Sequence, residues 1–314
     1  MAARYDDARW GNGRERHHGG PERDVGGRGG GDARPRDDDP RDVFRRDLDL
    51  PNDRERVVVR YRDRSYRLND EDVRALSTIG AFRVLAEEDI VRPSTDDARV
   101  REDEGRVDRL RDAGLLETVA IDGGDQRAVA LTSEGRELLE ASRLERGDEP
   151  RQAFHARLCR PREMSHDMQV YRAYQREADG IRADGGRVTR VVLDHELKRE
   201  YQQFLQEPNR GDAHSDGRPG RSREEAHEWA DRQDLPWFDD RVHFPDCRIE
   251  FEDRYGRDQH RDIEVTTPHY RGGHAAATAR AGFSCHRGAG FSVGHGGGRG
   301  GRGPRGGLAE ELLR

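Results

Sequence analysis

The sequence predicts a mixed α+β protein in which two structured regions lie between polar tails. Residues 66–146 place apolar side chains at helical spacing and contain one β-hairpin pattern. Residues 165–288 alternate helical and strand patterns around a second hairpin at 243–267. The segments outside these ranges hold few aliphatic residues. These three observations predict two domains, with residues 147–164 as a polar connector.

Composition and charge limit the kinds of function to consider. The chain has 314 residues, of which 32% are hydrophobic and 39% are charged, so much of it cannot belong to a packed core. Its formal net charge of −7 does not favour nucleic acid globally, so a DNA-binding surface must be local. The three cysteines form no paired framework, and no apolar run reaches the length of a membrane span. We therefore expect a cytoplasmic protein without a membrane partner.

The two tails have different compositions. Residues 1–60 mix Arg, Asp and Gly, which predicts a disordered segment because too little apolar area is present to offset the ordering entropy. The tail at 289–314 contains an arginine–glycine run, residues 296–307, without an acidic residue. Such a run can contact single-stranded nucleic acid. The alternative is that it is a flexible linker to an apolar turn at 308–313.

The first structured region opens with a helix signal. Asn69 is expected to cap a helix with Asp72 at the third position, and Val73, Leu76 and Ile79 follow at helical spacing. The apolar side chains that come after this helix extend its face. A short helix near 87–91 and an amphipathic helix over 97–113 come next.

A hairpin and a further helix complete this region. Residues 115–121 predict a strand, 122–125 a glycine-containing turn and 127–131 the returning strand, and a helix starts at 132. Three helices, a hairpin and a helix, in that order, are typical of a winged helix-turn-helix domain.

This domain suggests DNA binding, with the helix over 97–113 in a major groove and the wing on the backbone. Arg101 and Arg109 on the outward face, and Arg127 in the wing, are the candidate DNA-binding residues. Carboxylates flank those arginines and would repel phosphate. The alternative is therefore that the domain mediates dimerisation or contact with a protein partner.

The second structured region begins with a helix that Ser165 is expected to cap. A buried strand over 187–193 follows and ends at Asp194. The remaining elements are listed here: a helix over 195–205, a polar insertion over 206–222, a helix over 223–232, the hairpin, a helix over 275–280 and a strand over 282–286.

The hairpin at 243–267 carries the acidic residues that are the main candidates for a metal site. Asp246 opens its first strand, Gly256 marks its turn and Glu264 lies within its second strand. We expect the two carboxylates to meet at one end of a sheet, where they could hold Mg²⁺ against a phosphodiester. Asp194 or Glu196 is expected to add a third carboxylate. The alternative is that these acids only solvate the end of the hairpin.

The motifs around this hairpin resemble the PD-(D/E)xK nuclease superfamily, with Pro245-Asp246 as one half and Glu264-Val265-Thr266 as the other. The resemblance implies a restriction-endonuclease-like α/β domain in which Asp246 and Glu264 bind Mg²⁺ and act in catalysis. Thr266 stands in the place of the superfamily's lysine. Lys198 is the only lysine of the chain, so Arg280 is the nearest cation in sequence terms to fill that role.

Histidines supply further candidates. His166 beside Asp167 suggests a general base or a substrate contact, or only a feature of a helix start. His243, together with others near the same strand ends (His269 and His274), is more typical of surface positions. A zinc site built from Cys247, Cys285, His286 and His243 is excluded because no ligand spacing supports it.

Short motifs across residues 66–287 are similar to those of the replication-relaxation family: LNDED, IGAFR, SHD before an aromatic helix, and FPD. This resemblance implies a winged helix joined to a nuclease-like domain, as found on plasmids and integrated mobile elements. The hypothesis is a DNA-binding accessory protein that acts in replication, relaxation or mobilisation, with double-stranded DNA and a relaxase or replication proteins as partners. The alternatives are an active Mg²⁺-dependent endonuclease and a winged-helix transcriptional regulator.

Overall fold

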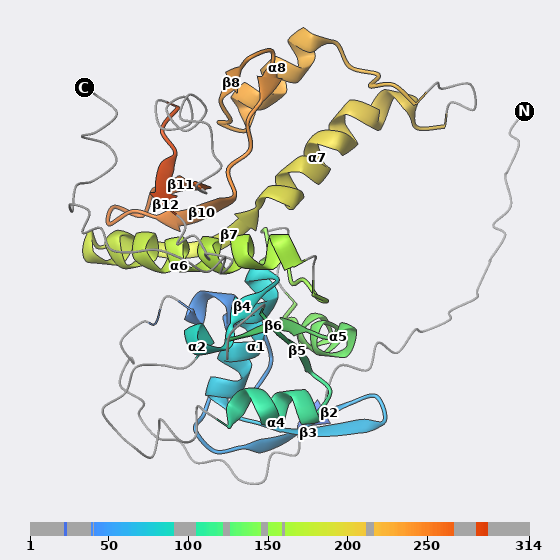
Figure 1. Ribbon diagram of the computed structural model, residues 1–314, viewed down its shortest axis with the longest axis vertical. Coiled ribbons are helices and arrows are strands. Elements are labelled where there is room, and N and C mark those ends of the chain that lie inside the picture. Colours follow the sequence, from blue (N-terminus) through green and yellow to red (C-terminus); the bar gives the residue numbers. More distant parts are fainter. Residues whose placement is uncertain are drawn as a thin grey trace, which may run out of the picture.

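Helices and several small sheets form a mixed α+β structure in the computed structural model (Figure 1). The residues that it describes are 22–23, 39, 41–90, 105–121, 126–145, 150–158, 161–211, 217–266 and 281–287. Within those residues, none of the helices combines the length and the apolar character that a membrane crossing requires.

Helix α1 (Asp70–Phe82) begins at the predicted capping box. The Asn69 side chain accepts a hydrogen bond from the Asp72 amide (3.0 Å), and the Asp72 carboxylate accepts one from the Asn69 amide (3.3 Å). The helix ends where Arg83 adopts a positive φ of 69°. Strand β4 (Leu85–Ala86) follows, so the predicted extension of the helical face is wrong beyond Phe82.

The hairpin predicted after α1 is present. Strand β5 (Leu116–Ala120) pairs with β6 (Arg127–Leu131), and β4 joins the free edge of β6 in a three-stranded antiparallel sheet. Three helices accompany this sheet: α2 (Glu87–Ile90), α4 (Arg106–Asp112) and α5 (Ser133–Ala141). The predicted helix over 97–113 is therefore confirmed in its last part, and residues 97–104 lie outside the described residues.

The prediction of disorder up to residue 60 is wrong from residue 41 onward. This stretch contains a 3-10 helix, η1 (Asp42–Arg45), and a second hairpin, β2 (Val57–Tyr61) with β3 (Arg64–Leu68), beside which β1 (Glu22–Arg23) pairs. Phe44 is only 1% exposed and contacts the rings of Phe82 and Tyr174. A few apolar side chains at fixed positions order the segment, although its average composition is that of a disordered chain.

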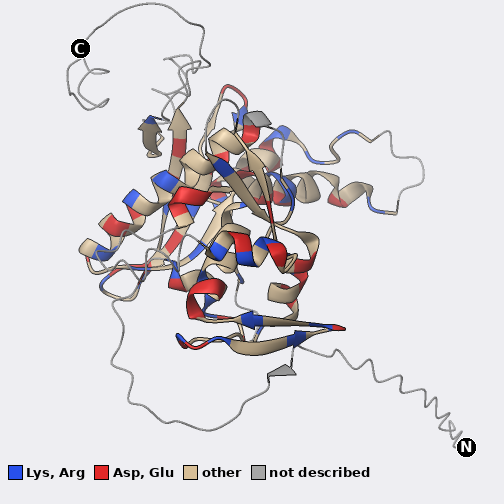
Figure 2. Ribbon diagram, turned by 60° about the horizontal axis from the view of Figure 1, so that its bottom comes forward, with Lys and Arg blue, Asp and Glu red and all other residues tan. Residues whose placement is uncertain are grey.

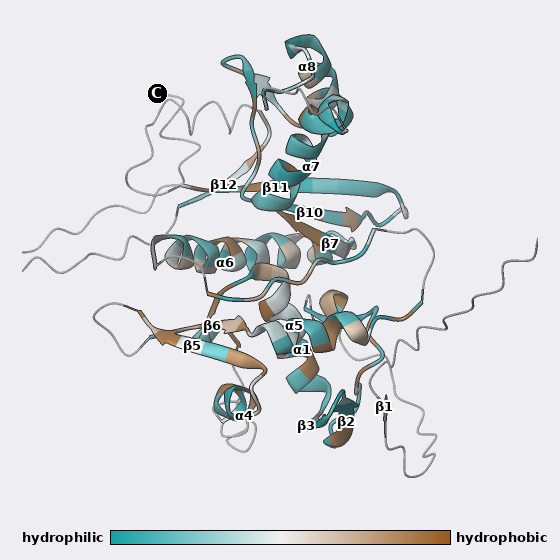
Figure 3. Ribbon diagram, turned by 90° about the vertical axis from the view of Figure 1, so that its right-hand side faces the viewer, coloured by the Kyte–Doolittle hydropathy of each residue, from teal (hydrophilic) through white to brown (hydrophobic). Residues whose placement is uncertain are grey.

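Helix α6 (Pro161–Ala183) lies between the two halves of the molecule (Figures 1 and 3). It starts at Pro161, a residue that suits the first helical turn, so Ser165 lies inside the helix and does not cap it. The phenol ring of Tyr171 packs edge-on against Phe82, 5.0 Å between centroids.

The second half is built on a four-stranded sheet with the order β12-β11-β10-β7. Its strands are β7 (Arg187–Leu193), β10 (Cys247–Glu252), β11 (Asp258–Thr266) and β12 (Ser284–Arg287). Neighbouring strands run antiparallel from β7 to β11, whereas β11 and β12 run parallel. The predicted central hairpin is confirmed, and the predicted helix over 275–280 lies outside the described residues.

The remaining elements connect β7 to β10. They are α7 (Asp194–Gln206), η2 (Glu207–Asn209), α8 (Arg223–Arg232) and the short hairpin β8 (Trp237–Phe238) with β9 (Arg241–Val242). The positions of α7 and α8 confirm the predicted helices.

One hydrophobic core joins the two halves. The same cluster of buried side chains contains Phe44 and Phe82 from the first half, Tyr174 from α6, and Ile249 and Val265 from the second sheet. Helix α6 therefore supplies packing to both halves.

Candidate functional site

Asp246 stands at the end of the second sheet, directly before β10. Cys247 pairs with Ile263, and extending this register by one residue brings Asp246 level with Glu264. One oxygen of the Asp246 carboxylate accepts a hydrogen bond from the Val265 amide (2.7 Å). The other lies 3.1 Å from Nε2 of His166 on α6. Both carboxylate oxygens thus have partners within the protein.

His166 depends on the same contact. Its hydrogen bond to Asp246 raises the pKa of the imidazole and outweighs the opposing effect of burial. Asp167, beside it, pairs with Arg83 at 3.6 Å. His166 therefore lies in the second turn of α6 with its side chain partly exposed, and it contacts the Asp246 carboxylate.

Glu264 is buried, with 5% of its surface exposed. Ile263 and Val265, its neighbours in β11, belong to the core that α6 covers. Because successive side chains of a strand point to opposite faces, Glu264 lies on the other face of the sheet. The register places Asp246 directly opposite Glu264, and directly opposed residues of an antiparallel pair share a face. The Asp246 carboxylate, one residue before β10, contacts the Val265 amide and His166 of α6.

Asp194 begins α7 and is linked to the same sheet end through its backbone, since its amide donates to the Asp246 carbonyl oxygen (3.2 Å). Its carboxylate accepts a hydrogen bond from Lys198 Nζ (2.6 Å). Burial opposes ionisation of Asp194, but the neighbouring His195 and the hydrogen bond from Lys198 prevail and hold its pKa well below the usual range. One helical turn therefore brings the chain's only lysine to this sheet end, which its distance in sequence did not suggest.

A cluster of potential metal ligands lies beside Asp194. Among the described residues, one group of three or more His, Cys, Asp or Glu residues has its ligand atoms within 4.8 Å of one another: His155, His195 and Glu196. Nε2 of His195 is 3.3 Å from Nδ1 of His155, and Nε2 of His155 is 3.5 Å from Oε1 of Glu196. The predicted ligands Asp246, Glu264 and Asp194 do not form such a group.

The connector before α6 positions His155. The Gln152 side chain bonds to both backbone groups of Val191 in β7, donating to its carbonyl at 3.1 Å and accepting from its amide at 2.9 Å. The backbone amide of His155 donates to the Gly80 carbonyl oxygen (2.8 Å). His195 and Glu196 lie in the first turn of α7, so β7 and α1 together bring the two imidazole rings into edge-to-face contact, 4.5 Å between centroids.

Burial and hydrogen bonding tune the two most buried members of this cluster. Burial lowers the pKa of His155 and favours the neutral imidazole. Burial opposes the ionisation of Glu196, but the neighbouring His155, 3.5 Å away, and the hydrogen bond from the Leu193 amide overcome it and lower the pKa of this carboxyl. A neutral imidazole beside an ionised carboxylate is the protonation state that metal ligands require.

The predicted DNA-binding arginines are bound to carboxylates where they are described. Arg127 donates to Glu87 (2.6 Å) and to Asp108 (3.3 Å), and the hydrogen bond to Glu87 raises its pKa. Arg109 donates to Asp72 at 3.4 Å. Arg101 and Arg280 lie outside the described residues.

Asp72 gathers three arginines. Its buried carboxylate accepts hydrogen bonds from Arg56 (3.1 Å), Arg106 (3.2 Å) and Arg109 (3.4 Å). The side chain of Arg106 is only 3% exposed. Arg109 is thus part of the packing between α4 and α1.

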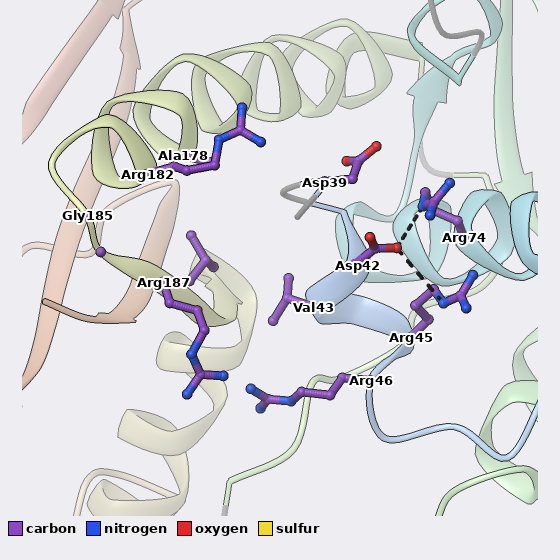
Figure 4. A pocket seen from close by; sticks show the side chains of 12 residues that line it. Asp39, Asp42, Val43, Arg45, Arg46, Arg74, Ala178, Arg182, Gly185 and Arg187 are labelled. Carbon is purple, nitrogen blue, oxygen red and sulfur yellow. Dashed lines mark hydrogen bonds and ion pairs between the residues drawn. The ribbon is translucent and has the colours of Figure 1, made fainter. Parts of the chain in front are cut away.

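A cavity of about 550 Å³ lies at the opposite end of β7 (Figure 4). The guanidinium groups of Arg46 and Arg187 extend toward each other across it, and Arg182 enters from the end of α6. Burial, reinforced by the neighbouring Arg74, lowers the pKa of Arg45, another lining residue. Seven residues of strand separate this cavity from the Asp194 end, about 20 Å.

Acidic and basic residues are interspersed along the described helices and strands in Figure 2. The expectation that His243 is a surface residue is wrong: His243 is buried, and its ring nitrogen contacts the Phe238 carbonyl oxygen (3.0 Å). His269 and His274 lie outside the described residues.

Comparison of the chain with protein-family models, with curated proteins and with solved structures found no match. A functional proposal therefore rests on three structural features: the geometry of the second sheet, the histidine cluster and the arginine cavity.

Proposed function

We propose that this chain is a DNA-binding accessory protein of a plasmid or an integrated mobile element, acting in replication, relaxation or mobilisation. In this proposal the second sheet is a nuclease-like domain that engages DNA without efficient cleavage. The observation that carries the proposal is the strand arrangement: three antiparallel strands followed by a parallel one, with Asp246 before the second and Glu264 within the third. The winged-helix interpretation of the first half adds a second element suited to DNA.

The contacts of the acidic residues favour binding over cleavage. Both oxygens of Asp246 have protein partners, and Glu264 is buried, with 5% of its surface exposed. A two-carboxylate Mg²⁺ site needs oxygens that converge and are open to the phosphate.

Phosphate contact is best assigned to the arginines of the cavity. Arg182 pairs with Asp179 and Arg187 with Glu252, each at 2.8 Å and each between exposed side chains. Surface ion pairs of this kind contribute little, so these guanidinium groups can exchange their partner for a phosphate. Arg46, which is 35% exposed, completes the set.

A salt titration tests this assignment. Binding of a short fluorescent DNA duplex is measured by anisotropy for the wild type, for the triple variant Arg46→Gln/Arg182→Gln/Arg187→Gln, and for Arg257→Gln. Each phosphate contact contributes about 0.9 to the slope of log K against log salt, so the triple variant should lose about 2 to 3 from the slope. Arg257 is the matched control, since it is exposed in the hairpin turn and paired with Asp253.

Two results would contradict the proposal, one for the role of the cavity and the other for DNA binding as a whole. An unchanged slope in the triple variant would remove the cavity from the DNA-binding surface. If the wild type fails to bind duplex DNA even at low salt, the accessory function itself is rejected.

One observation favours a second candidate function, an active Mg²⁺-dependent endonuclease. Lys198 pairs with Asp194, whose amide is bonded to Asp246, so a lysine stands at the sheet end where the superfamily uses one. Incubation of supercoiled plasmid with the protein, in Mg²⁺ or in EDTA, separates the two functions. Mg²⁺-dependent nicking that disappears in Asp246→Ala and Lys198→Met establishes the endonuclease, whereas intact plasmid supports binding without cleavage.

A further inference from the structure

We propose that His155, His195 and Glu196 form a binding site for a divalent transition-metal ion of the zinc type. These residues take no part in the proposed DNA contacts. The metal site and the proposed function therefore stand or fall separately.

The spacing of the ligand atoms fits such an ion. One potential ligand atom from each of the three residues lies within 4.8 Å of the others. The two imidazoles approach to 3.3 Å between Nε2 of His195 and Nδ1 of His155, and Glu196 lies 3.5 Å from the other ring nitrogen of His155, Nε2. A tetrahedral zinc ion with bonds of about 2.0–2.1 Å holds its ligand atoms about 3.3 Å apart.

The imidazoles also have bonding capacity that the protein does not use. Nε2 of His155 and Nδ1 of His195 are buried atoms for which the described residues supply no hydrogen-bond partner of good geometry. A buried polar atom without a partner costs free energy. A metal ion bound to Nε2 of His195 and Nδ1 of His155 leaves the other nitrogen of each ring to carry its proton toward Asp194 and toward Oε1 of Glu196. The second oxygen of Glu196 is then the one that binds the ion.

Neighbouring groups hold the ligands in place. Oε1 of Glu196 accepts a hydrogen bond from the Leu193 amide (3.1 Å), which fixes the carboxylate over the first turn of α7. Nδ1 of His195 lies 3.7 Å from the carboxylate of Asp194, which Lys198 anchors. A carboxylate behind a histidine is the usual arrangement that orients a metal-bound imidazole.

The ligand types select the metal. Two imidazoles and one carboxylate suit zinc and its neighbours in the first transition row, whereas Mg²⁺ prefers oxygen ligands alone. Three protein ligands leave one of four positions for water or for an anionic ligand. The site is therefore open, and it adjoins the sheet end that carries Asp194 and Asp246.

A metal titration of the full chain tests the proposal. The protein is freed of metal by dialysis against a chelator and titrated with zinc chloride by calorimetry and by competition with a chromophoric chelator. The variants are His155→Gln, His195→Gln and Glu196→Gln. The last keeps an acceptor for the Leu193 amide, and so separates the loss of a ligand from the loss of a helix cap. His227→Gln is the matched control, because His227 is an exposed histidine 3.7 Å from Asp231.

The expected result is one tight equivalent of zinc in the wild type and in the control, lost in each triad variant. Removal of the supporting carboxylate by Asp194→Asn should weaken zinc binding on the order of 10–100-fold. Zinc should also raise the melting temperature of the wild type but not that of Glu196→Gln. If the triad variants bind as many tight equivalents as the wild type, or the wild type binds none, the proposal is overturned.

Discussion

Two carboxylate clusters lie on opposite sides of α6, and they differ in the cations that surround them (Figure 1). On the α1 side, Asp72 is buried under three guanidinium groups. On the α7 side, Glu196 and Asp194 face two imidazoles and one exposed lysine. Both clusters stabilise the first turn of a helix. Of the two, the α7 cluster contains imidazole nitrogens, whose lone pairs can bind a metal ion.

The difference shows how to distinguish an acidic residue that only stabilises the fold from one that could bind a metal ion. Arginine remains protonated and offers five donors but no lone pair, so a carboxylate surrounded by arginines has no place for a metal ion. A neutral histidine offers a lone pair, and its protonation changes near neutral pH. Acidic residues that face histidines are therefore the ones whose partners can be exchanged.

The largest expected effect comes from Asp72→Asn. This change leaves the buried guanidinium of Arg106 without its carboxylate, and breaking a buried ion pair costs about 3–5 kcal/mol. Urea unfolding followed by circular dichroism measures the loss. Asp179→Asn, which removes an exposed partner of Arg182, is the control and should cost less than about 1 kcal/mol. A loss of similar size in both variants would remove the distinction drawn for the Asp72 cluster.

A smaller effect is expected for Asn69→Ala, which removes the cap of α1. Loss of an N-cap side chain costs about 1 kcal/mol, measured by the same unfolding experiment. Because Asn69 and Asp72 bond to each other's backbone, the double variant should lose less than the sum of the single losses. Thr132→Ala, at the cap of α5, should by contrast be additive with Asp72→Asn. Strict additivity of Asn69→Ala would show that the capping box does not couple the pair.

Asp194→Asn should cost about 1 kcal/mol or less at neutral pH, because its partner Lys198 is exposed. The folded-state pKa of Asp194 is depressed, so its contribution is present above the ordinary aspartate pKa of about 3.9 and is lost as the pH falls below it. Unfolding of the wild type and the variant should therefore converge in acid. A loss as large as that of Asp72→Asn would place Asp194 among the acidic residues that only stabilise the fold.

The smallest effect concerns Glu177→Gln on α6, which bonds to His286 and Arg261, each at 2.8 Å. The hydrogen bond to His286 is the main cause that lowers the pKa of Glu177. The contribution is thus present above the ordinary glutamate pKa of about 4.3 and is lost as the pH falls through the folded value. We expect a few tenths of a kcal/mol at pH 7 and none in strong acid, from urea midpoints. A difference that grows on acidification would contradict this sign.

Local patterns were sufficient to predict much of the fold. The Asn69–Asp72 spacing gives the start of α1, and the hairpin around Gly256 follows from alternation and a turn residue that adopts a φ of +74°. These features depend on residues close together in the chain. The ordered segment around Phe44 was not predicted, because Phe44 is held by contacts with Phe82 and Tyr174, which are distant in sequence. The composition around Phe44 gives no sign of these contacts.

The histidine cluster shows the limit of prediction for the site. His155 and His195 are 40 residues apart, and they meet because Gln152 bonds to the backbone of β7 and the His155 amide bonds to Gly80 of α1. No spacing rule links them, although Glu196 was a candidate carboxylate from its place after a strand. The predicted pair of Asp246 and Glu264 came level through hairpin register, whereas the contact of Asp246 with His166 depends on α6 and could not be inferred from the hairpin alone.

The position of α6 bears on how such a chain can change during evolution. Its aromatic rings pack with both halves: Tyr171 and Tyr174 belong to the same hydrophobic core as residues of α1 and of the second sheet. A recombination event that exchanged only one half would leave these rings facing a foreign surface or water. Successful shuffling between genomes should therefore transfer the helix together with both of its neighbours, so that the protein is inherited as one piece.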